Sequence, residues 1–271
     1  MQKNQLYQPF QPLLTNKGRQ SFGLSVQQYP AKGRLAGAIH SYLQVTTPKP
    51  TLYPMIPDGT QAIFISEESI QIGGAHSQSM DIQIHQAGDY FGIRFYPGAL
   101  RHFFKLNLSE ITGQFVDSQY FPCRIFADLH HHIYKQKEFL NRAHVCEKWL
   151  LQHFTPQSPC AFDLALSLIY QSSGNIEISN LANKTGLSSR HLNRLFQQYT
   201  GLNTKKFSQI IRIQNVCKRL YETPNNSLEM AIDSGFFDQA HLLNEYKRFL
   251  LVNPRSLFNR FVSDYYNNKG L

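Results

Sequence analysis

Apolar and polar residues alternate along the chain between about residues 52 and 97. A strand that buries one face requires this period of two, and the short intervals between the alternating runs suit turns. Because parallel strands need long crossovers, the spacing favours an antiparallel sheet, sandwich or barrel. Four prolines between residues 48 and 57 predict an irregular, turn-rich segment ahead of the sheet. The alternating apolar residues are Ile63 and Ile65, Ile70 and Ile72, Ile82 and Ile84, and Phe91, Ile93 and Phe95.

From residue 139 the apolar period lengthens to three or four, as in an amphipathic helix. Prolines at 156 and 159 must end this helix, and the chain beyond them has only short helical patterns broken by glycines. We therefore expect an α+β chain of two domains, β-rich over residues 1–157 and all-α over residues 158–271. The residues of the helical stripe are Phe139, Ala143, Cys146, Leu150 and Phe154.

Residues 178–196 have the order of parts that a helix-turn-helix requires. Ser179 is the predicted N-cap of a short helix, and Gly186 supplies the left-handed turn. Leu187 is expected to pack between the two helices, and Ser188 to cap the second. The buried stripe predicted for that second helix is Leu192, Leu195 and Phe196.

Polar side chains are predicted to face outward from this second helix. Arginine, asparagine and glutamine can each make paired hydrogen bonds to a guanine or adenine edge in the major groove. For this segment taken alone, a plain helical hairpin with a solvated polar face is an equal alternative. The outward-facing residues are Ser189, Arg190, Asn193, Arg194 and Gln197.

The same order of parts recurs over residues 226–249, where Ala231, Gly235 and Phe236 take the places of Ala182, Gly186 and Leu187. Leu242, Tyr246 and Phe249 form the predicted inner stripe. The apolar spacing from residue 207 to residue 221 predicts a connecting helix of roughly 15 residues, about 22 Å long. Such a rod could hold two reading helices about one DNA turn, or about 34 Å, apart.

Residues from about 162 to 263 resemble the DNA-binding domain of AraC/XylS-type transcription regulators. The chain departs from the family pattern at Leu250 and Leu251, where members usually have a Gly-x-(Ser/Thr)-Pro run. Asn244 stands where many members have arginine, and Leu243 replaces a small polar residue, so the resemblance gives the first unit more weight in specificity. The matching positions are Leu181-Ala182, Gly186-Leu187-Ser188, Arg190 to Phe196, Thr200-Gly201, Ile211-Arg212, Ala231, Gly235-Phe236, Asp238-Gln239, Lys247-Arg248-Phe249 and Asn253-Pro254.

The resemblance implies two helix-turn-helix units joined by a linker helix, acting as a sequence-specific transcription regulator and favouring an activator. Its expected partners are double-stranded promoter DNA and RNA polymerase. A homodimer formed through the stripe from Phe139 to Phe154 is open, since that stripe could equally pack on its own β-domain. The residues implied in DNA binding are Ser188, Ser189, Arg190, His191, Asn193, Arg194, Gln197, Asp238, Gln239, Ala240, His241, Asn244, Lys247 and Arg248.

The N-terminal part resembles, less closely, the cupin-like sensory domains that often precede this helix pair. The resemblance rests on residues 53–59 and 91–99 and implies a small effector, dimerisation, or both. Tyr53, Asp58 and Arg94 are the candidate effector-binding residues, with Arg94 holding an anionic group as guanidinium forks do. The alternative is that Asp58 and Arg94 form a turn and a structural ion pair.

The composition agrees with a polyanionic partner. The 271 residues carry 27 Lys and Arg against 18 Asp and Glu, a formal charge of +9. No apolar run is long enough for a membrane span, and no signal peptide is recognisable, so a cytoplasmic protein is expected. The four scattered cysteines, Cys123, Cys146, Cys160 and Cys217, are interpreted as reduced thiols.

We expect no enzyme activity, cofactor or metal. Neighbouring histidines on a helix point about 100° apart, so residues 130–132 suit a solvated or irregular segment better than a metal site. Two other functions stay open. One is a ligand- or partner-binding regulator whose second unit no longer reads bases, and the other is a repair protein that accepts alkyl groups on a cysteine.

Overall fold

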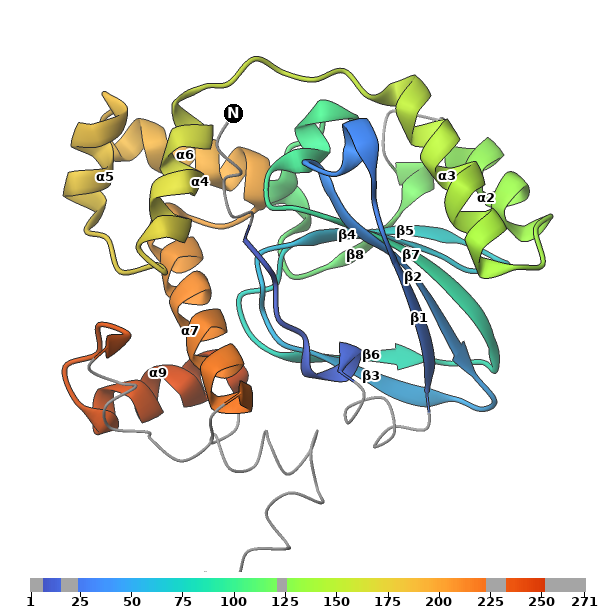
Figure 1. Cartoon of the computed structure of the whole chain (residues 1–271), viewed down its shortest axis with the longest axis horizontal. Helices are drawn as coiled ribbons and strands as arrows, with labels where there is room; N and C mark the ends of the chain where they lie inside the picture. The colour runs from blue at the N-terminus through green and yellow to red at the C-terminus, as the bar shows by residue number, and fades with distance from the viewer. Residues whose placement is uncertain (1–6, 16–23, 121–125, 223–232, 252–271) are drawn as a thin grey trace, which may run out of the picture.

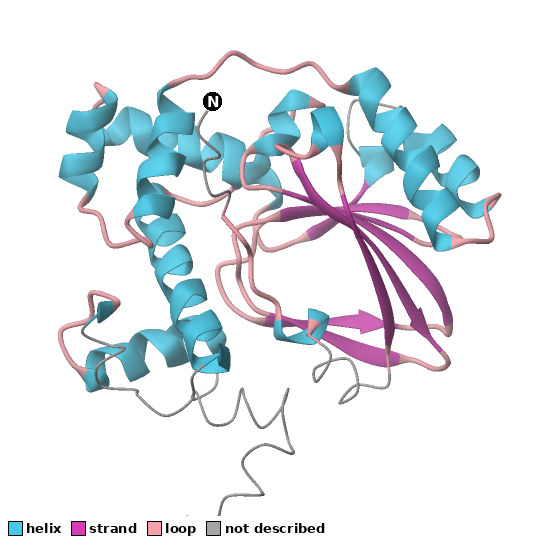
Figure 2. Ribbon diagram, in the orientation of Figure 1, coloured by secondary structure: helices cyan, strands magenta, loops and turns pink. Residues whose placement is uncertain are grey.

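The computed structural model describes residues 7–15, 24–120, 126–222 and 233–251, without the side chains of 127 and 128. Figure 1 shows a β-rich domain beside a helical domain, joined by the long segment that follows α3 (Phe139–His153). Strands fill the first domain and helices the second, as Figure 2 shows. The two-domain α+β architecture expected from the sequence is confirmed. The predicted boundary between 157 and 158 falls in the segment 154–160, which has neither helix nor strand.

The β-domain contains a six-stranded sheet and a separate two-stranded sheet, and every paired strand is antiparallel. The antiparallel sheet expected from the two-residue period is therefore confirmed. The strand order in the large sheet is β1 (Ser25–Pro30), β2 (Ile39–Thr47), β7 (Gly88–Phe95), β4 (Gln61–Ile65), β5 (Ile70–Gly73) and β8 (Phe115–Asp117). The small sheet pairs β3 (Thr51–Met55) with β6 (Met80–Ile84).

The expectation of an irregular segment over residues 48–57 is wrong, because β3 occupies its middle. Pro54 lies opposite Asp81 in a strand that, among the described residues, pairs on one side only. A proline cannot donate to a sheet ladder, but an edge strand has one side on which no donor is needed. Its presence in β3 is therefore compatible with regular strand structure.

Two helices cover the large sheet, α2 (Phe126–Tyr134) and α3. The helix expected from residue 139 is confirmed, and its stripe of Phe139, Ala143, Cys146 and Leu150 is buried in the core of the β-domain. Because the stripe packs on its own sheet, it gives no support to a homodimer. Residues 130–132 lie within α2, so this segment is helical rather than irregular, and His131 and His132 are exposed, as expected for a solvated segment. Short 3-10 turns complete this domain: η1 (Pro12–Leu14), η2 (Gly33–Leu35), η3 (Ala99–His102), η4 (Leu108–Ile111) and η5 (Ser118–Tyr120).

The helical domain consists of short helices around one long one, α7. The helix α7 runs for 19 residues rather than the roughly 15 expected, which makes it about 28 Å long. The helices α6 and α9 lie toward its two ends (Figure 1). The bounds are α4 (Ala161–Gln171), α5 (Ile178–Thr185), α6 (Ser189–Thr200), α7 (Thr204–Glu222) and α9 (Gln239–Leu250).

The two domains share one hydrophobic core. Leu13 and Ile56 of the β-domain are buried in the same cluster as Phe162 and Phe207 of the helical domain. The ring of Tyr7 stacks on that of Tyr170 with centroids 4.9 Å apart. Burial of this kind holds the domains in one orientation, because separating them would expose apolar surface to water.

None of the helices in the described ranges is both long enough and apolar enough to cross a membrane.

Candidate nucleic-acid interface

The first helix-turn-helix unit is α5, the turn at Gly186, and α6. Gly186 ends α5 with φ +68°, the left-handed conformation that the sequence predicts there. The hydroxyl of Ser188 accepts a hydrogen bond from the backbone N–H of His191 at 3.2 Å, so Ser188 caps α6 as expected. The prediction for Ser179 is wrong: the N-cap of α5 is Glu177, and Ser179 lies inside the helix.

One face of α6 is buried and the other is in solvent. Leu192 and Phe196 are fully buried, and Leu195 is half-buried, so the predicted inner stripe is confirmed. His191 is half-buried at the border between the two faces. The exposed residues on the outer face are Ser189, Arg190, Arg194 and Gln197.

Asn193 departs from the predicted outward set. Its side chain is half-buried, and its Oδ1 accepts a hydrogen bond from the backbone N–H of Thr204 at 3.0 Å. Thr204 is the first residue of α7, so the amide of Asn193 satisfies one of the unpaired donors at that helix end. The side chain therefore joins α6 to α7, and the expectation that it faces outward is wrong.

The turn and the second helix of the second unit repeat those of the first unit. Gly235 has φ +76° and Phe236 is buried, both as expected. Asp238 caps α9, with Oδ1 accepting the backbone N–H of His241 at 2.7 Å. The inner stripe of Leu242, Tyr246 and Phe249 is buried. The predicted first helix of this unit, which includes Ala231, lies outside the described residues.

The outer face of α9 is exposed along its length. Arg248 also pairs with Glu245 of the same helix, with Nη1 and Oε1 3.1 Å apart. Of the departures from the family pattern, Leu243 is half-buried and Asn244 is exposed. The exposed residues among those implied in DNA binding are Asp238, Gln239, Ala240, His241, Asn244, Lys247 and Arg248.

Phe237 is a residue that sequence reasoning missed. Its side chain is 89% exposed, directly before the cap of α9, and its backbone N–H donates to Nδ1 of His241. The neighbouring Phe236 is buried under the guanidinium of Arg212, which lies 4.7 Å from the centre of its ring. The signal was a pair of consecutive phenylalanines, of which only one can point into the core at a turn.

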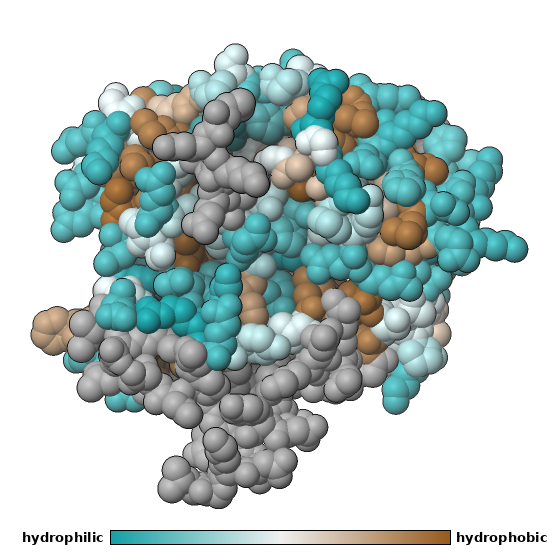
Figure 3. Space-filling model, in the orientation of Figure 1, coloured by the Kyte–Doolittle hydropathy of each residue, from teal (hydrophilic) through white to brown (hydrophobic). Residues whose placement is uncertain are grey.

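Basic side chains gather where α7 meets α9. The ammonium of Lys206 lies over the ring of Phe249, 4.5 Å from its centre. Burial and the positive charge of Arg248 lower the pKa of Lys206, against a smaller opposing effect of Glu245. On the face shown in Figure 3, hydrophilic residues cover most of the described surface, and apolar residues form separate small patches.

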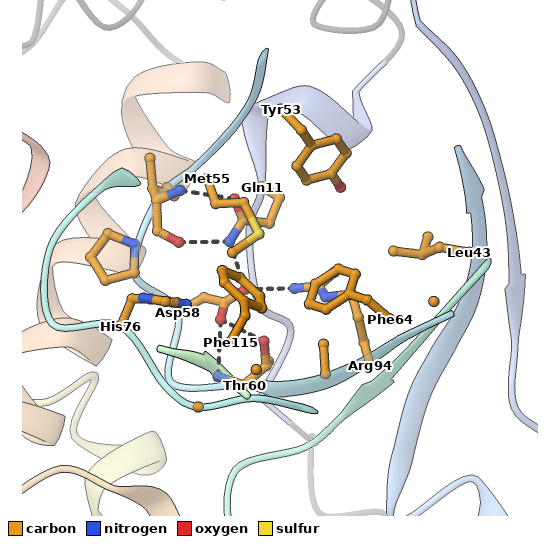
Figure 4. Close-up of a pocket in the computed structure, with 16 residues that line it drawn as sticks. Gln11, Leu43, Tyr53, Met55, Asp58, Thr60, Phe64, His76, Arg94 and Phe115 are labelled. Carbon is orange, nitrogen blue, oxygen red and sulfur yellow. Dashed lines mark hydrogen bonds and ion pairs between the residues drawn. The ribbon is translucent and has the colours of Figure 1, made fainter. Parts of the chain in front are cut away.

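In the β-domain, Asp58 and Arg94 form a buried ion pair, with Oδ2 and Nη2 2.5 Å apart. The same oxygen accepts a hydrogen bond from Nε2 of Gln11, and Oδ1 accepts the backbone N–H of Thr60 (Figure 4). The structural ion pair considered for these residues is therefore present. Nη1 of Arg94 is buried and has no hydrogen-bond partner among the described residues.

Two cavities lie between the large and the small sheet. The smaller, of about 40 Å³, is lined by Asp58, Arg94 and His76, and burial lowers the pKa of His76. The larger, of about 310 Å³, shares Tyr53 and Phe115 with the smaller one as lining residues. The structure thus brings Tyr53, Asp58 and Arg94 together at one cavity. Within the described residues no cluster of histidine, cysteine or carboxylate side chains could hold a metal ion.

Residues 181–260 match the family described as a helix-turn-helix domain. The chain is 30% identical over 84 residues to a protein of Proteus vulgaris named "Probable transcription factor PqrA", of which it covers 69%, while the match covers 31% of this chain. The chain belongs to the AraC-type helix-turn-helix transcriptional regulators. Residues 27–117 match a domain of unknown function, DUF6597.

The chain also resembles two further proteins. It is 34% identical over 80 residues to the HTH-type transcriptional regulator GlxA of Rhizobium meliloti, which is 30% of this chain and 25% of that one. The chain thus spans a quarter to a third of the length of the first curated relatives it matches. A crystal structure of ToxT from Vibrio cholerae aligns with 89% of this chain and 99% of that one, at 10% identity and a TM-score of 0.45.

Proposed function

We propose that this AraC-type regulator binds promoter DNA sequence-specifically, with α6 and α9 in successive major grooves on one face of the duplex. The observation that carries the proposal is that two capped helices, each with an exposed polar face, lie toward the ends of one 19-residue helix. At about 28 Å, α7 is close to the length of one DNA turn, about 34 Å.

In α6, Arg194 and Gln197 are the proposed base-reading residues, because both are exposed and arginine and glutamine pair with guanine and adenine edges. Ser188, Ser189 and Arg190 at the helix start are proposed to hold a phosphate, since backbone N–H groups and the helix dipole favour an anion there. His191 is proposed as a further contact at the rim of the groove. Asn193 supports α7 and contributes to binding only through the position of α6.

In α9, the proposed base contacts are made by Gln239, His241 and Asn244, with Ala240 and the ring of Phe237 as apolar partners for thymine methyl groups. Lys247 and Arg248 are proposed to neutralise phosphates, and Asp238 to cap the helix. The exposure of Asn244 favours a second unit that still reads DNA over one that has lost this role.

The two cavities between the sheets, which share lining residues, are proposed to take one small, largely apolar effector. Its polar end would be an anion or another acceptor, because Nη1 of Arg94 is a buried donor without a partner among the described residues. Tyr53 lines both cavities, and Asp58 holds Arg94 in place. RNA polymerase is the proposed protein partner of an activator, and a homodimer would need a surface other than the buried stripe of α3.

Alkyl acceptance on cysteine is the weaker alternative. Such chemistry needs a thiolate, yet burial raises the pKa of Cys146 well above its usual value and that of Cys217 to about 12. The exposed Cys160 donates its S–H to a carboxylate oxygen of Asp163. Cys123 lies outside the described residues.

The test is a binding titration on a site recovered from genomic DNA. Fragments that bind the full chain are selected and sequenced, and fluorescence anisotropy then compares the recovered duplex with a scrambled one at several salt concentrations. We expect affinity for the recovered site at least about 10³-fold above that for the scrambled one, and a steep fall with salt. Equal affinity for both duplexes would contradict sequence-specific binding.

A further inference from the structure

The β-domain holds the C-terminal end of α6. The hydroxyl of Thr112 donates to the carbonyl of Gly201 at 2.6 Å, and Nε2 of Gln61 lies 3.4 Å from the carbonyl of Thr200. Gly201 has φ +78°, and a Cβ there would lie 2.9 Å from the backbone oxygen of Leu108. The end of α6 thus touches the β-domain so closely that a side chain at Gly201 would not fit without a shift.

The β-domain also holds the C-terminal end of α9, through the segment between β5 and β6. The backbone N–H of Ser79 donates to the carbonyl of Phe249 at 2.8 Å, and Nε2 of Gln78 donates to that of Arg248 at 3.0 Å. The residue after α9, Leu251, has φ +60°, a conformation that favours glycine. Hydrogen bonds from another domain to these carbonyls stabilise the helix end, because the last four carbonyls of a helix have no partner inside it.

The two points of attachment are bonded to each other. The backbone N–H of Gly74 donates to the carbonyl of Gln114, and that of Gly113 donates to the carbonyl of Ala75. Thr112 therefore directly precedes residues 113–114, which are hydrogen-bonded to the start of the β5–β6 segment. Gln78 and Ser79 lie at the end of the same segment. Residues 74–79 and 112–114, which we name the brace, form one hydrogen-bonded unit between the two reading helices.

We propose that the brace, together with Gln61, sets the separation and orientation of α6 and α9. Thr112, Gln61, Gln78 and Ser79 are then positioning residues for DNA reading, acting through the helix ends rather than by touching DNA. The effect of the brace on DNA reading rests on the proposed function, whereas the attachment of the two helix ends rests on the hydrogen bonds alone. The alternative is that α7 alone fixes the spacing, in which case loss of a brace contact would leave both helices in place.

The brace also borders the small cavity of the β-domain. His76, in the middle of the β5–β6 segment, lines that cavity with Arg94, and its Nε2 is buried without a partner among the described residues. Three residues further along the chain, Ser79 bonds α9. The segment that the reading helix depends on is therefore also a wall of the space proposed for an effector.

The first arm of the test measures amide hydrogen exchange of the full chain by mass spectrometry, without DNA. Gln78→Glu places an acceptor against the carbonyl of Arg248, and Thr112→Val removes the donor to Gly201. We expect Gln78→Glu to speed exchange in the last turns of α9 about fivefold and leave α6 unchanged, and Thr112→Val to do the reverse. Gln119→Glu, which makes the same charge change on η5, is expected to alter neither helix.

The second arm measures spacing discrimination on the recovered site, with two base pairs inserted between its halves. We expect the wild-type chain to lose about tenfold or more in affinity on the lengthened duplex, and Gln78→Glu to lose no more than about threefold relative to its own affinity for the original. The hydrogen-exchange measurement needs no DNA. Failure of the chain to bind any duplex would therefore contradict the proposed function, while the exchange result would still test the brace. Unchanged exchange in both variants, equal acceleration in α6 and α9, or unchanged spacing discrimination in Gln78→Glu would overturn the inference.

Discussion

The carboxylate of Asp58 lies 2.5 Å from Nη2 of Arg94, and both side chains are buried. Asp58 also accepts a hydrogen bond from Gln11, which in turn bonds the backbone of Ile56 through both ends of its amide. The pair thus fastens the N-terminal segment to the β-domain, while one nitrogen of Arg94 is left over at the cavity. One arginine combines a structural contact with a donor for a ligand.

Removing one member of this pair should destabilise the chain strongly. Asp58→Asn leaves the guanidinium of Arg94 buried without its counter-charge, so we expect the free energy of unfolding to fall by about 3–5 kcal/mol. Equilibrium unfolding in urea, followed by circular dichroism, measures the change. Glu68→Gln, at an exposed position of the same domain, serves as control and should change the stability by less than about 0.5 kcal/mol. A loss below about 1 kcal/mol for Asp58→Asn would show that the pair is solvated.

The sequence predicted those elements whose residues follow one clear period. The strands at Ile63 and Ile72 alternate between buried and more exposed positions, and the helix from Phe139 keeps its stripe on the sheet. The sequence did not predict the strand β2, because nearly all of its positions are buried, polar Ser41 and Gln44 included, and its sequence does not alternate. Both faces of β2 are covered, since Tyr42 packs in one hydrophobic core and Val45 in the other, and no local pattern reveals this cover.

The candidate site was predictable as far as local geometry decides it. The turn at Gly186 and the cap at Ser188 depend on neighbouring residues, and both are where the sequence places them. The bond from Asn193 to α7 and those from the β-domain to α9 join residues distant in sequence. Periodicity indicates which side chains face away from a core, but not which residues they contact there.

Asn193 and Arg194 should separate structural from base-reading roles. Asn193→Ala removes the acceptor for Thr204, and we expect the free energy of unfolding to fall by about 1 kcal/mol with base discrimination unchanged. Arg194→Ala should leave stability within about 0.5 kcal/mol and cost about 1–3 kcal/mol on the recovered site. Urea unfolding and anisotropy on matched and single-base-mismatched duplexes measure the two effects. Loss of discrimination with Asn193→Ala but not with Arg194→Ala would reverse the assignment.

Stability should fall in acid because of His40. Burial, with a contribution from Arg94, lowers the pKa of His40 to about 4 from an ordinary value of 6.5. Between these two pH values the unfolded chain binds the proton more readily than the folded one, so the free energy of unfolding decreases as pH falls from about 6.5 to about 4. Urea unfolding at stepwise pH should show a smaller decrease in His40→Gln than in the wild type. Parallel pH profiles for the two proteins would argue against this assignment.

Phe237 should contribute to DNA affinity and not to stability. With 89% of its side chain exposed, the ring has little to lose on unfolding, whereas burial against thymine methyl groups would contribute about 1–2 kcal/mol. We expect Phe237→Ala to weaken binding by that amount on the recovered site and to leave the urea midpoint unchanged, with Phe237→Leu in between. Undiminished affinity of Phe237→Ala would remove the ring from the interface.

The proposal that α6 and α9 read successive grooves is tested most directly by hydroxyl-radical footprinting of the full chain on its recovered site. We expect two protected tracts centred about 10 base pairs apart on one face of the duplex, with Arg194→Ala weakening the protection of one tract. A single short tract, or protection that follows no helical turn, would contradict the account.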